Sequence, residues 1–188
     1  RSFKNWIKLK NFAKSVFNKI TIAYPQNLET KNFLNQLYLK KIKMIGNLKF
    51  AENYEEKLIR INKRLEKEFK SKKIWIASST HKKEEVFCAK THLELKKRVK
   101  NLITIIIPRH IHRLNEIKTE INNFNLNISC HSSRVNNLKK VDIYIVDTFG
   151  ETKKFHNIGP SVFFGGSIIN RGGQNPLEAA RFGAKILH

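Results

Sequence analysis

The sequence predicts an α/β fold in which a parallel sheet is flanked by helices. From Lys73 onward, short apolar runs alternate with segments of helical periodicity, and such alternation indicates βαβ units with parallel strands. The run 102–107 is continuous and rich in β-branched residues, which is typical of a strand buried on both faces. Several runs end in glycine, serine or threonine, where a buried strand gives way to a turn.

Each element follows from its own local pattern. We expect a helix over 2–20, a strand over 21–24, a helix over 28–38, a strand over 43–45 and, after a polar stretch at 51–53, a helix over 54–69. Beyond these we expect strands at 74–77, 102–107, 127–130, 141–146, 161–164 and 185–187, and helices at 83–97, 111–122, 151–157 and 176–182. We place a domain boundary at the polar stretch, which divides the chain into residues 1–50 and 51–188.

The predicted helix over 2–20 is amphipathic and basic. Its apolar positions recur at helical spacing, and its lysines lie mostly on the rest of the helical wheel. A basic helix with Trp6 and Phe12 on its apolar face can lie in a membrane interface. The alternative is that this face packs against its own domain, and the sequence leaves both interpretations open.

The composition excludes a collagen, a coiled coil, a disulfide-stapled miniprotein and a membrane-spanning chain. The longest apolar run, 102–108, is far shorter than the roughly 18 residues that cross a bilayer. The 188 residues hold 37 Lys and Arg against 15 Asp and Glu, a formal net charge of +22. This excess either reflects compositional drift on solvated faces or serves an anionic partner such as phospholipid, nucleotide or nucleic acid. Cys88 and Cys130 lie outside any CxxC pattern, which favours a reducing compartment, and no signal peptide is evident.

Polar clusters follow two of the predicted strands, at the edge where parallel sheets bind ligands. In the first, residues 78–81, the hydroxyls can cap the next helix while Glu84 or Glu85 completes a capping box. In the second, Arg109 follows Pro108 at a strand exit. A guanidinium there suits phosphate or carboxylate, and a surface salt bridge is the alternative.

Glycine-containing clusters follow two further strands. In residues 147–151, Gly150 permits a sharp turn, and the helix start after it offers free N–H groups, while Glu151 can complement the helix dipole. The last cluster joins glycine pairs at 165–166 and 172–173 to a helix start, where Asn175 is the expected N-cap, Pro176 the first helical residue and Glu178 the third. Glycine pairs and helix start together predict an anion cradle near Arg171, in which Glu178 either completes a capping box or accepts hydrogen bonds from ribose hydroxyls.

These clusters are neither a Walker P-loop nor a GxGxxG motif. The histidines show no metal-ligand spacing, and neither cysteine has the surroundings of a catalytic nucleophile. The sequence therefore predicts no metal centre and no catalytic triad.

An ordered set of motifs, taken together, resembles the Kdo (3-deoxy-D-manno-octulosonic acid) transferases of lipopolysaccharide synthesis. The resemblance extends over essentially the whole chain, and its most specific motif is the last. The motifs are RSF at 1–3, GNLKF at 46–50, ASSTH at 77–81, PRH at 108–110, VDTFGE at 146–151 and GGSIINRGGQNPLE at 165–178.

The resemblance implies a GT-B glycosyltransferase with two Rossmann-like domains. Residues 1–50 would end the N-terminal acceptor domain, and residues 51–188 would form a truncated C-terminal domain that binds the donor. The implied reaction is an inverting, metal-independent transfer of Kdo from CMP-Kdo to a lipid A precursor (lipid IVA), without a cofactor. The implied partners are the donor, this acceptor and the anionic cytoplasmic face of the bacterial inner membrane, with which the enzyme associates peripherally, and not nucleic acid.

The family motifs assign donor (CMP) contacts to positions at strand ends and helix starts. By motif these are Pro108, Arg109, Phe149, Gly150, Glu151, Asn175, Pro176, Leu177 and Glu178. We expect N–H groups of 150–151 and 175–177 to hold phosphate, Arg109 to pair with phosphate or with a base or sugar oxygen, and Glu178 to accept from the ribose. Phe149 stands where methionine is common in the family.

The family's general base, a glutamate, matches nothing in this chain and is expected upstream of Arg1. The 188 residues are therefore expected to bind donor weakly and not to catalyse transfer alone.

Three alternatives differ in what they require. Another GT-B enzyme would use the same cluster for a different nucleotide sugar, such as a UDP sugar. A nucleic-acid-binding protein would gather arginine and aromatic residues on one face and bind with a steep salt dependence, whereas here the lysines are scattered. A peripheral membrane scaffold would use the N-terminal helix and leave the strand-end clusters without a role.

Overall fold

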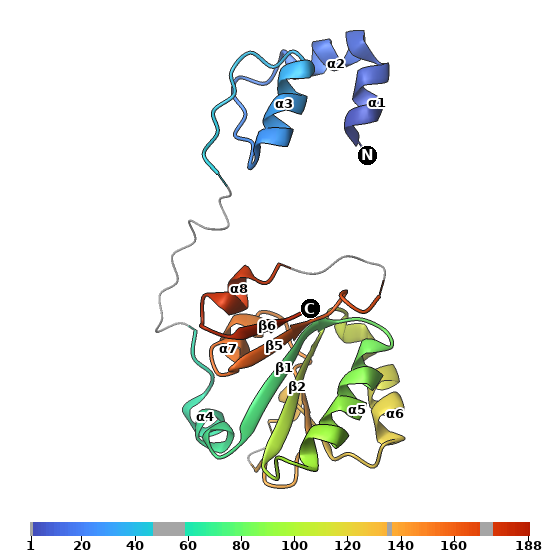
Figure 1. Ribbon diagram of the computed structural model, residues 1–188, viewed down its shortest axis with the longest axis vertical. Coiled ribbons are helices and arrows are strands. Elements are labelled where there is room, and N and C mark those ends of the chain that lie inside the picture. Colours follow the sequence, from blue (N-terminus) through green and yellow to red (C-terminus); the bar gives the residue numbers. More distant parts are fainter. Residues whose placement is uncertain (1, 47–58, 135–136, 170–174) are drawn as a thin grey trace. The chain divides into compact units, whose positions relative to one another are not determined.

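The computed structural model describes residues 2–46, 59–134, 137–169 and 175–188 (Figure 1). The chain forms two compact units: the N-terminal unit, residues 1–54, and the sheet unit, residues 55–188. The expected boundary at 51–53 lies outside the described residues, and the assignment of the two parts to acceptor and donor domains stays a prediction.

The N-terminal unit is mainly helical. Its helices are α1 (Ser2–Lys8), α2 (Lys10–Phe17) and α3 (Leu28–Gln36). Asn27 caps α3, because its Oδ1 accepts a hydrogen bond from the N–H of Thr30 at 2.8 Å. The strands expected at 21–24 and 43–45 are not formed as strands: in the described part of this unit, Ala23 and Ile42 form an isolated parallel bridge.

The single helix expected over 2–20 is wrong, because the chain leaves helical geometry at Leu9 (φ −111°, ψ 54°). Trp6 lies edge-on to Phe17, with their ring centroids 5.2 Å apart. In one straight helix these two residues would be separated by roughly 16 Å along the axis. Their contact therefore requires the break between α1 and α2.

The apolar stripe of these helices serves its own unit in part. Phe3 of α1 stacks on Phe33 of α3 at 4.0 Å between ring centroids, and Ala13 is buried. Leu9 and Phe12 stay exposed. Each interpretation of the amphipathic pattern thus accounts for some of its residues. Some apolar side chains pack within the unit, and others face solvent among lysines.

The sheet unit alternates strands with helices as the sequence predicts. In chain order its elements are α4 (Lys63–Lys70), β1 (Lys73–Thr80), α5 (Glu84–Lys96), β2 (Leu102–Pro108), the 3₁₀ turn η3 (Ile111–Arg113), α6 (Leu114–Asn122), β3 (Ile128–Cys130), the 3₁₀ turn η4 (His131–Ser133), β4 (Ile143–Ile145), α7 (Thr152–His156), β5 (Ser161–Phe164), α8 (Leu177–Ala180) and β6 (Lys185–Leu187). The helix expected over 54–69 is shorter in its described part, because the side chain of Asn62 accepts from the N–H of Arg64 at 2.8 Å and α4 begins there.

All strand pairs of the sheet are parallel, in the order β3-β4-β2-β1-β5-β6. This confirms the predicted Rossmann-like parallel sheet. From β1 the chain adds β2 beside it, then the edge strand β3, then β4 between β2 and β3, and it crosses back to add β5 on the other side of β1. The order therefore reverses between β1 and β5, and ligands of open α/β sheets bind at the carboxyl ends of strands beside such a reversal.

Both faces of the sheet are covered, so alternate residues of each strand enter different cores. Helices α5 and α6 cover one face, and α4, α7 and α8 lie against the other (Figure 1). In β2, Ile103 and Ile105 enter the core on the side of α4, α7 and α8, while Ile106 enters the core on the side of α5 and α6. Burial of each such side chain contributes about 2 kcal/mol to folding, which explains the continuous apolar run.

Both cysteines are buried and unpaired, Cys88 in α5 and Cys130 at the end of β3. Burial raises the pKa of each thiol. Among the described residues, none of the helices has the length and apolar character needed to cross a bilayer.

Candidate functional site

The exit of β2 is joined to the exit of β1. Pro108 is the buried last residue of β2 and lies opposite Thr80 in the register. The N–H of Arg109 donates to the carbonyl of Thr80 at 2.9 Å. The Arg109 side chain is exposed and forms no ion pair with the acidic residues that the structure describes. The surface salt bridge is therefore not formed, and the guanidinium is open to an anionic ligand.

The turn after β4 presents an unusually exposed aromatic ring. Phe149 is 88% exposed. Gly150 has φ +81°, a left-handed conformation that glycine adopts without strain. Glu151 flanks the start of α7, and its carboxylate accepts from Lys154 Nζ at 3.0 Å. Because β4 pairs with β2, this turn and Arg109 follow neighbouring strands at the same edge.

Helix α8 begins slightly later than expected. Residues 171–174 lie outside the described part of the chain, Pro176 flanks the helix, and Leu177 is its first residue. Pro176, and not Asn175 as predicted, is therefore at the N-cap position, and the Oδ1 of Asn175 accepts from the N–H of Leu177 at 3.1 Å from one residue further out. The N–H of Leu177 is thereby already bonded, and Pro176 has no N–H. Of the backbone N–H groups of 175–177 that were expected to hold phosphate, that of Asn175 therefore remains.

Glu178 is held from the side by α7 rather than folded back as a capping-box partner. Its Oε1 lies 3.7 Å from Lys153 Nζ and its Oε2 lies 3.8 Å from His156 Nδ1. The side chain keeps 32% of its surface exposed. A partly exposed carboxylate with neighbours beyond hydrogen-bond distance keeps its lone pairs for hydrogen bonds from a ligand.

His156 is a buried residue of this site that the sequence did not single out. It is 1% exposed, and its Nε2 lies 2.9 Å from Ser78 Oγ at the end of β1. Its Nδ1 has no hydrogen-bond partner among the described residues and faces Glu178. The histidine thus links the exits of β1 and β5 through α7.

The acid sensitivity of folding should depend on His156. Burial lowers the pKa of His156 to about 4, from an ordinary value of 6.5. Between pH 6.5 and 4 the unfolded chain binds a proton at this histidine and the folded chain does not. The contribution of the neutral, buried His156 to the free energy of unfolding is therefore complete above pH 6.5 and is lost as the pH falls toward 4. We expect wild type to lose about 3 kcal/mol more unfolding free energy over this range than His156→Gln, which keeps a partner for Ser78. Urea unfolding at pH 4 to 7 measures the difference; parallel curves for the two proteins would contradict the assignment.

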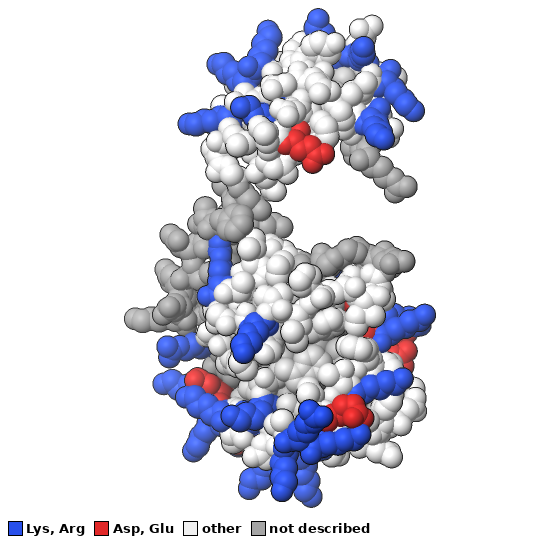
Figure 2. Space-filling model, in the orientation of Figure 1, with Lys and Arg blue, Asp and Glu red and all other residues white. Residues whose placement is uncertain are grey.

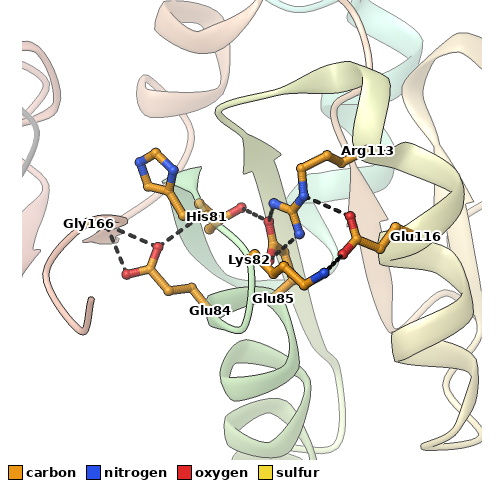
Figure 3. Close-up of polar contacts among 8 residues, drawn as sticks. His81, Lys82, Glu84, Glu85, Arg113, Glu116 and Gly166 are labelled. Atoms are coloured by element: carbon orange, nitrogen blue, oxygen red, sulfur yellow. Dashed lines mark hydrogen bonds and ion pairs between the residues drawn. The ribbon is translucent and has the colours of Figure 1, made fainter. Parts of the chain in front are cut away.

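Two neighbouring carboxylates at the start of α5, those of Glu84 and Glu85, point in different directions at this edge of the sheet (Figure 3). Glu84 accepts from the N–H of His81 at 2.9 Å, which is one half of the predicted capping box, and also from the N–H of Gly166 at 2.9 Å. The other half is not formed, because Lys83 is at the N-cap position of α5 and no side chain caps the helix there. Glu85 points away from Glu84, toward Thr80 and Arg113, and accepts from Arg113 Nη1 at 3.0 Å. The hydroxyls of 78–81 were expected to cap α5, but Thr80 donates to Glu85 instead.

A cavity of about 630 Å³ lies beside the exits of β3 and β4, next to α4. This volume is within the range of about 300–1,000 Å³ typical of small-molecule sites. Glu151 is the residue of the predicted donor set found in its wall. Thr148 Oγ1, also in the wall, is buried without a hydrogen-bond partner among the described residues. Among the described residues, those in the wall are Asn62, Arg64, Leu65, Glu68, His131, Ser132, Arg134, Tyr144, Thr148 and Glu151.

The predicted donor residues thus follow β2, β4 and β5 at one edge of the sheet unit, and contacts between α7 and α8 join two of their groups. Within the described residues, no three His, Cys, Asp or Glu side chains are placed to hold a metal ion. No local pattern marks His156 as a site residue, because burial of a histidine in the lysine-rich helix α7 depends on tertiary packing.

Comparison with known proteins identifies relatives along the whole chain. Residues 1–52 match the family model described as 3-deoxy-D-manno-octulosonic-acid transferase (kdotransferase). The 3-deoxy-D-manno-octulosonic acid transferase of Rickettsia prowazekii is 34% identical over 196 residues, which cover 100% of this chain and 40% of the relative. A bifunctional glycosyltransferase/methyltransferase of Fusobacterium nucleatum is 35% identical and covers 95% of this chain and 28% of its own. The chain therefore spans less than half the length of these curated relatives.

A solved structure shares the fold of the sheet. The crystal structure of the C-terminal CMP-Kdo binding domain of WaaA from Acinetobacter baumannii superposes with a TM-score of 0.60 at 23% identity. The match covers 66% of this chain and 67% of that domain.

Proposed function

We propose that the chain is a member of the 3-deoxy-D-manno-octulosonic acid transferase family, as its family-model match and its relatives support, and that the protein transfers Kdo from CMP-Kdo to a lipid A precursor with inversion of configuration. In this proposal the sheet unit binds the CMP donor and the N-terminal unit belongs to the acceptor side. The observation that carries the proposal is the common edge: the residues that match family motifs follow β2, β4 and β5, where parallel sheets bind ligands.

The roles follow from the exposure and partners of each group. Glu178, which lies beside Lys153 and His156 and is partly exposed, accepts hydrogen bonds from the ribose hydroxyls. Arg109 has no described acidic partner and pairs with the phosphate. The exposed ring of Phe149 offers a flat apolar surface to the cytosine base.

The basic surface supports anionic partners. Figure 2 shows lysine and arginine spread over both units, with far fewer acidic side chains on the face drawn. In the N-terminal unit the exposed Leu9 and Phe12 stand among exposed lysines at positions 4, 8, 10, 14 and 19. Each lysine near an anionic leaflet adds about 1 kcal/mol of attraction. We place this unit toward the cytoplasmic face of the inner membrane and the phosphates of the acceptor.

Donor binding should depend on Glu178 and Arg109. We expect Glu178→Ala and Arg109→Ala each to weaken CMP binding at least tenfold in calorimetry, because each removes a charged group from the site. The control for Glu178→Ala is Glu94→Ala on the exposed face of α5, and the control for Arg109→Ala is Lys185→Ala at the start of β6, away from the carboxyl ends of the strands. Each control removes the same charge as its partner variant and should bind CMP as wild type does.

The same titration tests the alternative donor. Another GT-B enzyme would prefer UDP or GDP to CMP, so a panel of the three nucleotides distinguishes the two. Unchanged CMP binding in both Glu178→Ala and Arg109→Ala would reject the assigned roles.

A further inference from the structure

The point where the strand order reverses is occupied by one buried carboxylate. Glu84 is 0% exposed, at the first turn of α5. Its Oε1 accepts from the N–H of Gly166 at 2.9 Å and of Ile168 at 3.3 Å, and its Oε2 from the N–H of Gly166 at 3.0 Å and of His81 at 2.9 Å. The glutamate thus binds both sides of the reversal, the exit of β1 and the exit of β5.

Backbone geometry shows how closely these two exits are fitted. The N–H of Gly165 donates to the carbonyl of Ser78 at 2.8 Å. Ser79 and Lys83 adopt left-handed backbone conformations, with φ 56° and 80°, and Gly166 has φ +85°. Left-handed conformations cost a non-glycine residue about 1 kcal/mol or more, so the surrounding contacts must hold this backbone in place.

Glu84 is stabilised here by amides and not by a counter-ion. In the described residues no lysine, arginine or histidine forms an ion pair with it, and its oxygens are satisfied by the three backbone N–H groups. A buried carboxylate is tolerated when charge-assisted hydrogen bonds replace its water shell. The bond to His81 is local to the start of α5, so the bonds to Gly166 and Ile168 are additional to that local role.

We infer that Glu84 is a positioning residue of the donor site: it fixes the backbone at Gly166 and Ile168, from which the chain leads to Asn175 and Glu178. The inference rests on the proposed donor site. In the sequence only six residues lie between Ile168 and Asn175, so the anchored amides limit where α8 can start. A carboxylate in β1–α5 thereby controls the placement of ribose and phosphate contacts contributed by the segment after β5.

The neighbouring Glu85 provides a matched control. It is equally buried, on the same turn of α5, but its partners are Thr80 and Arg113, which belong to β1 and η3. Glutamine in place of either residue keeps the shape and removes the charge. At Glu84 the new amide NH₂ would face a backbone N–H donor of the segment after β5, whereas at Glu85 that segment is untouched.

The test combines amide hydrogen exchange with CMP calorimetry on the full chain carrying Glu84→Gln or Glu85→Gln. We expect the amides of Gly166 and Ile168 to exchange at least tenfold faster in Glu84→Gln, and CMP affinity to fall at least tenfold. Glu85→Gln, which should lower the melting temperature comparably, should change CMP affinity less than threefold. If Glu84→Gln does not fold, Glu84→Asp, which keeps the charge and withdraws the oxygens, should show the same pattern.

The outcomes separate this inference from the proposed function. Equal loss of CMP affinity in Glu84→Gln and Glu85→Gln, or wild-type affinity in both Glu84 variants, would overturn the positioning role while leaving the donor site in place. Wild-type protein that binds no CMP would overturn the proposed donor site and, with it, the role of Glu84 toward the donor.

Discussion

Replacing Gly165 by alanine should destabilise the sheet unit by at least about 3 kcal/mol, near the upper end of what overpacking costs. A Cβ at this position would overlap the carbonyl oxygen of Ser79 and lie 2.7 Å from Thr80 Cα. These are backbone atoms of β1, so no side chain can turn aside to make room. Urea unfolding of Gly165→Ala against wild type measures the loss.

Gly183→Ala is the control for this substitution. Gly183 has φ +75°, and a Cβ there would meet nothing within 4 Å. Its cost is therefore conformational and should be about 1 kcal/mol. If Gly165→Ala costs no more than Gly183→Ala, the exits of β1 and β5 are not in tight contact.

Replacing Arg113 by methionine should cost about 3–5 kcal/mol at neutral pH, because it leaves the buried carboxylate of Glu85 without its cation. The Arg113 side chain is only 12% exposed and lies 3.0 Å from Glu85. Methionine retains much of the volume, so the loss is mainly electrostatic. The control is Lys82→Met: Lys82 pairs with Glu116 at 2.6 Å but is 67% exposed, and such surface pairs contribute about 0–1 kcal/mol.

The cost of Arg113→Met should shrink as the pH falls. Burial already raises the pKa of Glu85 above its usual value, although Arg113 opposes the shift. Without Arg113 this pKa rises further, the folded variant takes up a proton, and its deficit against wild type decreases below that pKa. Adding Glu85→Gln to Arg113→Met should likewise recover part of the loss in denaturant unfolding. If the stability deficit of Arg113→Met is independent of pH and unaffected by Glu85→Gln, the deficit is due to lost packing and not to the unpaired carboxylate.

Local pattern predicted the elements of the sheet unit well. The strands expected at 161–164 and 185–187 have the observed bounds, because each is flanked by proline or glycine and is short and apolar. The run 102–107 extends by one residue to Pro108. Pattern worked here because both faces of the sheet are buried, so most positions of its central strands are apolar for the same reason.

Contacts between distant segments could not be predicted in this way. The bond of Glu84 to the His81 N–H spans three residues and was predicted as part of a capping box, whereas its bonds to Gly166 cross 82 residues and depend on β5 lying beside β1. The break at Leu9 has the same origin. No proline or glycine marks it, and the contact of Trp6 with Phe17 favours it.

The two deeply placed cysteines make the protein convenient for site-specific labelling. Cys88 is 0% exposed, Cys130 is 5% exposed, and burial keeps both sulfurs in the unreactive thiol form. A single cysteine introduced at position 149, which is 88% exposed, would therefore accept a maleimide fluorophore with little background from the native sulfurs. A dye at this position would stand beside the candidate nucleotide site, and the two natural cysteines would not have to be removed first.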